Sequence, residues 1–199
     1  MRSFVAPRGL RRMTSARGDS MTDRLRSPVM LVRLDAGDRA LFQRLLLSAR
    51  HPRTRSLVTG LTHLGGARAS ILLCLWPLLA SGSWPVLARH ALATLVVSHL
   101  FVQLVKRSVG RPRPSCGLGS VALVVDPDRF SFPSGHAAAA LAVALAYASL
   151  WPSLALPLLA LALAVGASRI VLGVHYPGDV AAGQAIALAT HVLLLQLGL

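Results

Sequence analysis

Three short polar segments interrupt the apolar stretches of this sequence, and each carries residue types that can bind anions. The first reads KRSVGRPRP and holds Lys106 and Arg113 around a proline-rich turn. The planar guanidinium of arginine matches the oxygens of a phosphate group, and the lysine ammonium adds a compact positive charge. Taken alone, such a segment also fits a basic loop that attracts anionic lipid.

The second polar segment, FPSGH, lies immediately before a run of small apolar residues. Ser134 and Gly135 stand where a helix is expected to begin, and the free N–H groups of a helix N-terminus form an anion site. Ser134 is equally suited to cap that helix. His136 would lie beside a bound anion and could donate a proton to it. A single histidine in this place can also be purely structural.

The third polar segment, SRIVLGVHYPGD, combines a cation, an imidazole and a carboxylate. Arg169 is a costly charge in or near a bilayer unless it has a partner. His175 and Asp179 are four residues apart across a Tyr-Pro-Gly turn. A carboxylate bonded to one imidazole nitrogen makes the other nitrogen a better nucleophile. The alternative is that Asp179 only caps the next helix.

Membrane crossings account for the spacing of these segments. Five apolar runs, at 57–80, 86–105, 136–151, 154–172 and 180–198, approach the roughly 20 residues that span a bilayer. Lipid cannot satisfy an open backbone, so each run is expected to be helical. Because successive crossings alternate in direction, Lys106, His136 and His175 fall on one membrane face. We therefore predict an all-α, polytopic bundle of about five transmembrane helices.

Composition supports this class of protein. The chain of 199 residues is 54% hydrophobic and only 14% charged, with a mean hydropathy of +0.59. The formal net charge is +14, but no basic stripe with interleaved aromatic residues indicates a nucleic-acid partner. Anionic lipid or phosphate fits better. The two cysteines, Cys74 and Cys116, lack metal-ligand spacing and are interpreted as free thiols.

The N-terminal region is interpreted separately. Residues 1–33 are rich in arginine and predict a disordered basic tail, so the domain is expected to cover residues 34–199. Residues 36–50 predict an amphipathic helix, either lying in the membrane interface or packed as an ordinary surface helix. Its apolar face is formed by Leu41, Phe42, Leu45 and Leu46.

The polar segments together resemble the signature of the type 2 phosphatidic acid phosphatase/haloperoxidase superfamily. Its motifs are Lys, six residues, Arg-Pro; then Pro-Ser-Gly-His; then Ser-Arg, five residues, His, three residues, Asp. The matching positions in this chain are Lys106 with Arg113-Pro114, Pro133-Ser134-Gly135-His136, and Ser168-Arg169 with His175 and Asp179. The resemblance covers roughly residues 36–198.

The resemblance implies a mechanism. His175 would attack phosphorus and form a phosphohistidine, and Asp179 would orient it. His136 would protonate the leaving lipid oxygen and then activate water. The phosphoryl oxygens would be held by Lys106, Arg113, Ser134, Gly135 and Arg169. No metal ligands and no cofactor are expected.

The function that we expect is an integral-membrane hydrolase of lipid phosphates, in a bacterial inner (plasma) membrane. Alternatives are a vanadate-dependent haloperoxidase, which the apolar runs disfavour, and a catalytically silent lipid-binding protein. The substrate classes left open are phosphatidic acid, phosphatidylglycerol phosphate and polyprenyl phosphates or diphosphates. Thirteen arginines precede residue 57, and the positive-inside rule then favours a cytoplasmic active-site mouth.

Other polar residues within the runs receive structural interpretations. His99 and Gln103 share a face that leads to Lys106 and are expected either to form interhelical hydrogen bonds or to support the site. His191 and Gln196, near the end of the last run, are expected at the membrane interface.

Overall fold

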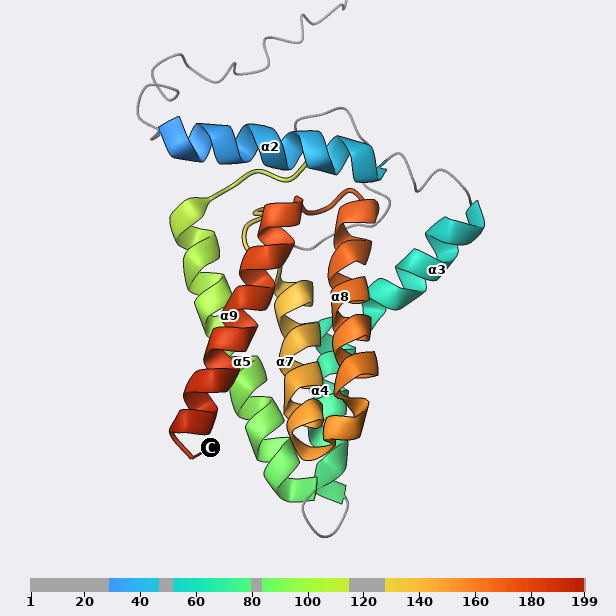
Figure 1. Cartoon of the computed structure of the whole chain (residues 1–199), viewed down its shortest axis with the longest axis vertical. Coiled ribbons are helices and arrows are strands. Elements are labelled where there is room, and N and C mark those ends of the chain that lie inside the picture. Colours follow the sequence, from blue (N-terminus) through green and yellow to red (C-terminus); the bar gives the residue numbers. More distant parts are fainter. Residues whose placement is uncertain (1–28, 47–51, 80–83, 115–127, 199) are drawn as a thin grey trace, which may run out of the picture. The chain divides into compact units, whose positions relative to one another are not determined.

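The apolar runs of the sequence form a bundle of α-helices in the computed structural model (Figure 1). The structure describes residues 29–46, 52–79, 84–114 and 128–198. Its α-helices are α2 (Val29–Leu46), α3 (Pro52–His63), α4 (Ala67–Leu75), α5 (Trp84–Val109), α7 (Gly135–Leu150), α8 (Ala155–Val171) and α9 (Pro177–Gln196), with 3₁₀ turns η2 (Trp76–Leu79) and η3 (Pro152–Leu154). Residues 37–199 form one unit, and the chain before them another. The all-α prediction is confirmed.

Among the described residues, three helical segments are long and apolar enough to cross a membrane: Trp84–Val109, Pro152–Val171 and Pro177–Gln196. A fourth candidate consists of two helices, Thr54–His63 and Ala67–Leu79, which are bent by 48° relative to each other. The remaining expected crossing, α7, has 16 residues. The polytopic bundle is confirmed, and the expected number of about five crossings stays a prediction.

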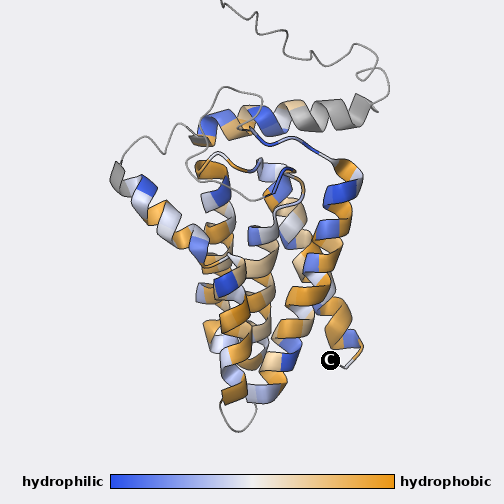
Figure 2. Ribbon diagram, turned by 180° about the vertical axis from the view of Figure 1, so that it is seen from behind, coloured by the Kyte–Doolittle hydropathy of each residue, from blue (hydrophilic) through white to orange (hydrophobic). Residues whose placement is uncertain are grey.

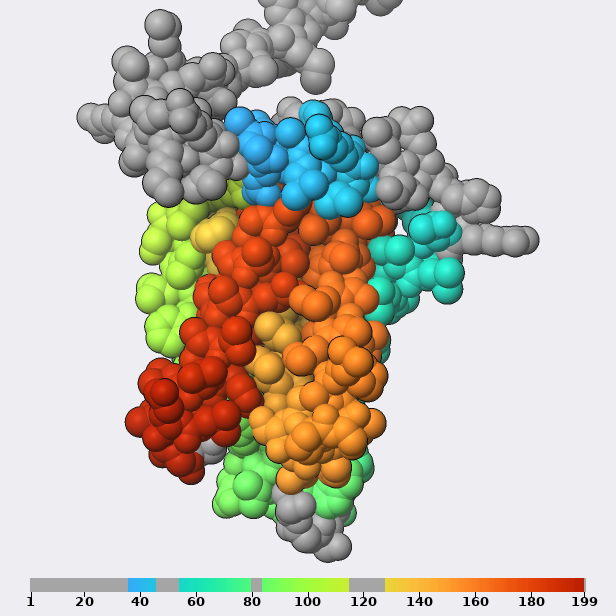
Figure 3. Space-filling model, viewed as in Figure 1, coloured from blue at the N-terminus to red at the C-terminus, as the bar shows by residue number. Residues whose placement is uncertain are grey.

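The central helix of the bundle is α7, which packs against α4, α5, α8 and α9. In Figure 1 it begins deeper in the bundle than the adjoining ends of α8 and α9. Figure 3 shows that α8 and α9 leave only a narrow strip of it visible. Its sequence, GHAAAALAVALAYASL, supplies small side chains that let four neighbours approach. At 16 residues it is about 24 Å long, less than the roughly 30 Å of a bilayer core.

At the bend between α3 and α4, the backbone of Gly65 closely approaches α7 and α8. A Cβ atom at Gly65 would lie 2.7 Å from the carbonyl oxygen of His136 and 2.7 Å from a methyl group of Val165. Only glycine therefore fits without displacing α7 or α8. The glycines that weaken the first apolar run in the sequence thus place α4 beside the start of α7.

Hydrophobic residues predominate along the helices of the bundle, and hydrophilic residues gather toward one end of it (Figure 2). Large exposed residues on the helices include Leu100, Leu156 and Leu163. In water such a surface is a liability, whereas in lipid it is the expected exterior. Near the opposite end Trp76, Trp84 and Trp151 stack in succession, with ring centroids 4.9 and 4.6 Å apart. Tryptophans typically mark a membrane interface.

Two local expectations are corrected. The helix predicted at 36–50 begins at Val29, because the apolar sequence before residue 36 contains no helix breaker after Pro28. Of its expected apolar face, Phe42 is buried, whereas Leu41 and Leu45 are exposed. The helix is therefore anchored to the bundle through Phe42, which packs edge-on against Tyr176.

His191 is also not at an interface. It is buried where α5, α7 and α9 converge. Its Nδ1 lies 3.0 Å from Nε2 of His90, and its Nε2 lies 3.2 Å from Oγ of Ser149. A buried polar group needs partners, and three helices supply them here. His99 and Gln103 are 3.1 Å apart on the same helix, so the hydrogen bond is intrahelical rather than interhelical.

Candidate active site

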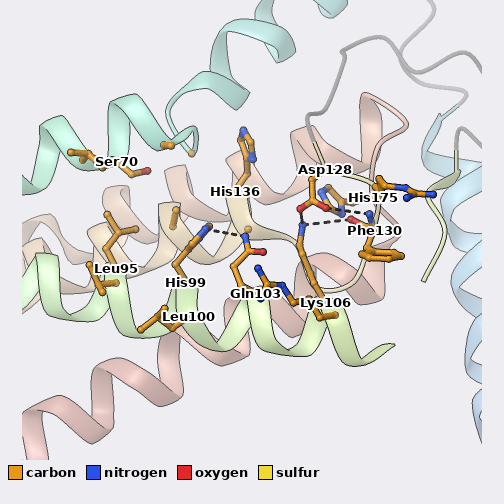
Figure 4. Close-up of a pocket in the computed structure, with 18 of the residues that line it drawn as sticks. Ser70, Leu95, His99, Leu100, Gln103, Lys106, Asp128, Phe130, His136 and His175 are labelled. Carbon is orange, nitrogen blue, oxygen red and sulfur yellow. Dashed lines mark hydrogen bonds and ion pairs between the residues drawn. The ribbon is translucent and has the colours of Figure 1, made fainter. Parts of the chain in front are cut away.

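A cavity of about 720 Å³ opens where the three polar segments meet. Five of the predicted site residues line it: Lys106, Arg113, Gly135, His136 and His175. Figure 4 shows Lys106 reaching from its helix toward Asp128, with His136 projecting from the neighbouring helix. The shared membrane face inferred from helix alternation is thus a single site in three dimensions.

The position of His175 is set by the turn between α8 and α9. Its backbone N–H donates to the carbonyl oxygen of Arg169 at 3.3 Å, and the side chain is only 1% exposed. Nε2 lies 3.3 Å from a terminal nitrogen of Arg113, and Nδ1 lies 3.6 Å from Oδ2 of Asp179. Burial, opposed by Asp179 and reinforced by the two arginines, lowers the pKa of His175 to about 4. The imidazole is therefore neutral at pH 7, as a nucleophile requires.

Asp179 combines the two roles that the sequence left as alternatives. Its Oδ2 accepts a hydrogen bond from the N–H of Tyr176 at 2.8 Å, which caps α9. The same oxygen faces His175. Its Oδ1 accepts a hydrogen bond from Arg111 at 2.6 Å. The carboxylate is completely buried, so this ion pair compensates for the loss of water around its charge.

Arg113 is held in place by backbone carbonyl groups. Its Nε donates to the carbonyl oxygen of Asp128 at 2.7 Å, and a terminal nitrogen donates to that of Val174 at 3.0 Å. The guanidinium is therefore fixed in orientation beside His175 before any substrate arrives. Preorganised donors of this kind stabilise charge that develops in a transition state.

Asp128 is a site residue that the sequence analysis missed. Its Oδ2 accepts a hydrogen bond from the ammonium of Lys106, and its Oδ1 accepts one from the N–H of Phe130 at 3.2 Å. The signal available in the sequence was an acidic residue close before the Pro-Ser-Gly-His segment, in an otherwise basic loop. That signal alone gives no partner, and the fold supplies Lys106.

The start of α7 joins two of the polar segments. Ser134 Oγ accepts a hydrogen bond from the N–H of Ala137 at 3.5 Å, so the capping role is present. The N–H of Ser134 donates to the carbonyl oxygen of Asp179 at 2.8 Å. A Cβ atom at Gly183 would overlap the carbonyl oxygen of Ser134. Close packing of α9 on this turn therefore depends on glycine at position 183.

Arg169 lies behind the cavity rather than in its wall. The side chain is 1% exposed, and a terminal nitrogen donates to Oγ1 of Thr62 at 2.9 Å. Ser134 and Asp179 are likewise completely buried and do not line the cavity. These three predicted residues thus surround the five that line it. Within the described part of the chain, no three His, Cys, Asp or Glu side chains gather as a metal-binding group.

The cavity continues away from these polar groups between α4, α5 and α7. Its apolar wall is formed by Ile71, Leu95, Val96, Leu100 and Ala139. Ile71 and Leu100 are also exposed on the outer surface of their helices. The site therefore combines a cationic end with an apolar channel, a shape that suits an amphiphile.

Comparison with known proteins identifies the family. The sequence model of the PAP2 superfamily matches residues 87–198. The chain belongs to the PAP2 superfamily. As in the PAP2 phosphatases of known structure, the helices form a membrane-embedded bundle. The structure of Aquifex aeolicus LpxE superposes with a TM-score of 0.70 at 26% identity, covering 79% of this chain and 93% of that one. The structure of a transmembrane PAP2-type phosphatidylglycerolphosphate phosphatase from Bacillus subtilis superposes with a TM-score of 0.67 at 25% identity. This superposition covers 83% of this chain and 86% of that one.

Curated relatives in the PAP2 superfamily include two kinds of lipid phosphatase. Lipid A 1-phosphatase of Rhizobium johnstonii is 36% identical over 126 residues, which cover 59% of this chain and 51% of the relative. Decaprenylphosphoryl-5-phosphoribose phosphatase of Mycobacterium tuberculosis is 44% identical over 95 residues, which cover 45% of this chain and 49% of the relative. The chain spans about half the length of these relatives. Its apolar helices and membrane-bound relatives make it a multi-pass membrane protein.

Proposed function

We propose that this protein is a membrane lipid phosphatase that works through a phosphohistidine intermediate. The observation that carries the proposal is the neutral His175, whose Nε2 lies beside the Arg113 guanidinium in a cavity with an apolar extension. The phosphate would occupy the cationic end, and the lipid chain would follow the channel between α4 and α5.

In the first step, Nε2 of His175 attacks phosphorus and the N–P bond forms while the bond to the lipid oxygen breaks. His136 gives its proton to that oxygen, and the lipid alcohol leaves. The Nδ1–H of His175 remains directed at Asp179, which stabilises the positive imidazolium. Developing charge on the phosphoryl oxygens is met by Lys106 and Arg113, with Gly135 contributing its N–H.

In the second step, His136 takes a proton from water, and the resulting nucleophile attacks phosphorus. The N–P bond breaks, inorganic phosphate is released and His175 returns to its neutral form. Ser134 and Arg169 support this site from behind: Ser134 fixes the start of α7, and Arg169 adds positive charge close to His175.

The proposed arrangement in the cell follows from charge. We assign residues 1–33 to a basic tail and residues 34–199 to the phosphatase domain, in a bacterial inner membrane. The 13 arginines before residue 57 favour the cytoplasmic side for the tail and for the active-site mouth.

Phosphate release tests the proposal. Purified protein in detergent is given phosphatidic acid, phosphatidylglycerol phosphate, undecaprenyl diphosphate, decaprenylphosphoryl-5-phosphoribose and lipid A, each in excess EDTA. We expect release from at least one lipid and inhibition by vanadate, which adopts the geometry of a phosphoryl group under attack. Activity that is abolished by EDTA and restored by Mg²⁺ would contradict the mechanism.

A further inference from the structure

Arg111 links α2 to the first turn of α9. A single terminal nitrogen of its guanidinium donates to Oδ1 of Asp179 at 2.6 Å and to Oδ2 of Asp38 at 2.7 Å. The guanidinium carbon lies 4.1 Å from the centroid of the Tyr176 ring. Asp38 in turn accepts a hydrogen bond from the N–H of Gly178 at 2.7 Å. Three segments distant in sequence thus meet around the Arg111 guanidinium.

This network is largely shielded from water. The exposed fraction of the side chain is 16% for Arg111, 12% for Asp38 and 0% for Asp179. A Cβ atom at Gly178 would lie 2.9 Å from Oδ2 of Asp38, so a larger residue at this position would displace the Asp38 carboxylate. Charges removed from water are tolerated when each has a partner in good geometry, and here one cation serves two anions.

We propose that Asp38 and Arg111 are positioning residues for the His175–Asp179 pair, an inference that rests on the proposed phosphatase function. Arg111 holds one carboxylate oxygen of Asp179 while the N–H of Tyr176 holds the other. The carboxylate therefore cannot rotate, and the oxygen held by Tyr176 stays directed at Nδ1 of His175.

Asp38 also sets the charge of this network. Arg111 by itself would neutralise Asp179 and weaken its attraction for an imidazolium. With Asp38 present, the three groups carry a net negative charge, because two carboxylates face one guanidinium. That balance favours the positive charge that His175 acquires when it attacks phosphorus.

The other groups around His175 do not supply this negative charge. Arg113 and Arg169 both disfavour a positive imidazole. The further ionisable groups that line the same cavity come from α5, α7 and the segment between them: His99, Lys106, Arg107, Asp128, Arg129 and His136. Lys106 and Asp128 pair with each other. Among the described residues, Asp179 is therefore the anion that stabilises a positive charge on His175. The groups paired with Asp179 determine the strength of this stabilisation.

The test compares isosteric and charge-altering variants. Asp38→Asn, Arg111→Gln and Arg111→Lys are assayed for lipid phosphate release across pH. The acid limb of the pH profile is the range in which kcat/KM falls as the pH decreases. Its position reports the pKa of the essential base of the free enzyme. We expect this limb to move to lower pH in Asp38→Asn and to higher pH in Arg111→Gln. Misplacement of the catalytic pair should lower kcat by about 10²-fold in Arg111→Gln, and Arg111→Lys should restore a large part of it.

One variant of the same helix serves as the control. Arg44→Gln removes a charge at an exposed position of α2. It should keep the wild-type acid limb. The inference is overturned if Asp38→Asn and Arg111→Gln also keep it, whatever happens to their rates. If Arg111→Gln does not fold, the isosteric Asp38→Asn decides.

A second readout does not require turnover. The pKa of His175, followed by NMR of histidine-labelled protein in detergent, should fall in Asp38→Asn and rise in Arg111→Gln. An unchanged pKa in Asp38→Asn would overturn the inference. Wild-type protein that releases phosphate from none of the five lipids would instead overturn the proposed function, and the NMR result would still decide the role of Asp38 and Arg111.

Discussion

The ammonium of Lys106 pairs with the carboxylate of Asp128 inside the cavity that also contains His175. The backbone carbonyl of Asp128 accepts a hydrogen bond from Arg113 as well. Burial tends to raise the pKa of Asp128, but hydrogen bonds from Lys106 and the Phe130 N–H, with the nearby positive charges, hold that pKa below its usual range. An ionised carboxylate therefore pairs with Lys106, the cation that we propose to bind the substrate phosphate.

Asp128→Asn should tighten inhibition by vanadate, because the incoming anion no longer displaces a carboxylate from Lys106. Ion pairs that are partly exposed contribute about 0.2–1 kcal/mol, so the inhibition constant should fall by about 1.4- to fivefold. Lys106→Ala, which removes the cation itself, should raise the constant. A weaker inhibition in Asp128→Asn would mean that Asp128 holds Lys106 in its binding position instead of competing with the ligand.

His175→Ala should abolish turnover while the protein still folds, since covalent catalysis cannot proceed without its nucleophile. Asp179→Asn should retain some activity, because the imidazole remains but loses its fixed partner. Phosphate release and circular dichroism in detergent measure the two properties. His63→Ala is the matched control, because its imidazole is exposed and lies outside the cavity. Full activity of His175→Ala would refute the proposed mechanism.

The pH profile should reflect the lowered pKa of His175. Because this pKa is about 4, the imidazole stays neutral as pH falls from 7 toward 5, and its protonation should not limit kcat/KM there. The acid limb due to His175 should lie well below the usual histidine pKa of about 6.5. In Asp179→Asn it should lie lower still, because Asp179 favours the protonated form.

The comparison between the two profiles removes a common complication. Phosphate groups of the substrate also titrate, but they do so identically for wild type and Asp179→Asn. A difference between the profiles therefore reports the enzyme. An acid limb that stays at the same pH in both proteins would show that His175 does not interact with Asp179 as described.

Gly183→Ala should lower activity strongly, since a Cβ atom there overlaps the carbonyl oxygen of Ser134 and forces α9 away from the start of α7. Overpacking of this kind typically costs about 1–3 kcal/mol of stability. Thermal unfolding and phosphate release should both decline. Gly60→Ala in α3 is the control, because nothing lies within 4 Å of a Cβ atom at that position. Equal behaviour of the two variants would contradict the described packing.

The membrane orientation can be read from cysteine labelling. In a variant without Cys74 and Cys116, Ser108→Cys marks the active-site end of α5, and Ser153→Cys marks the opposite end of the bundle. Both serines are exposed. With a cytoplasmic mouth, a membrane-impermeant maleimide should label Ser153→Cys in intact cells and Ser108→Cys only after lysis. The reverse pattern would place the active site on the outer face.

The sequence alone determined the helical bundle and the meeting of its three motifs. Apolar runs in a bilayer must be helical, and helices that cross it in succession must alternate in direction. Both constraints act on any chain with this pattern, so Lys106, His136 and His175 could be assigned to one end without knowledge of side-chain packing. The capping position of Ser134 is equally local, because it depends on its immediate neighbours.

The tertiary structure decided which side chains hold these motifs. Asp38 and Arg111 are 73 residues apart, and Arg169 meets Thr62 across 107 residues; no periodicity or local propensity encodes such pairs. The depth of α7 and the burial of His191 likewise depend on which helices become neighbours. Contacts of this kind are set by the packing of the whole bundle, where desolvated charges accept only the partners that the fold brings within a few ångströms.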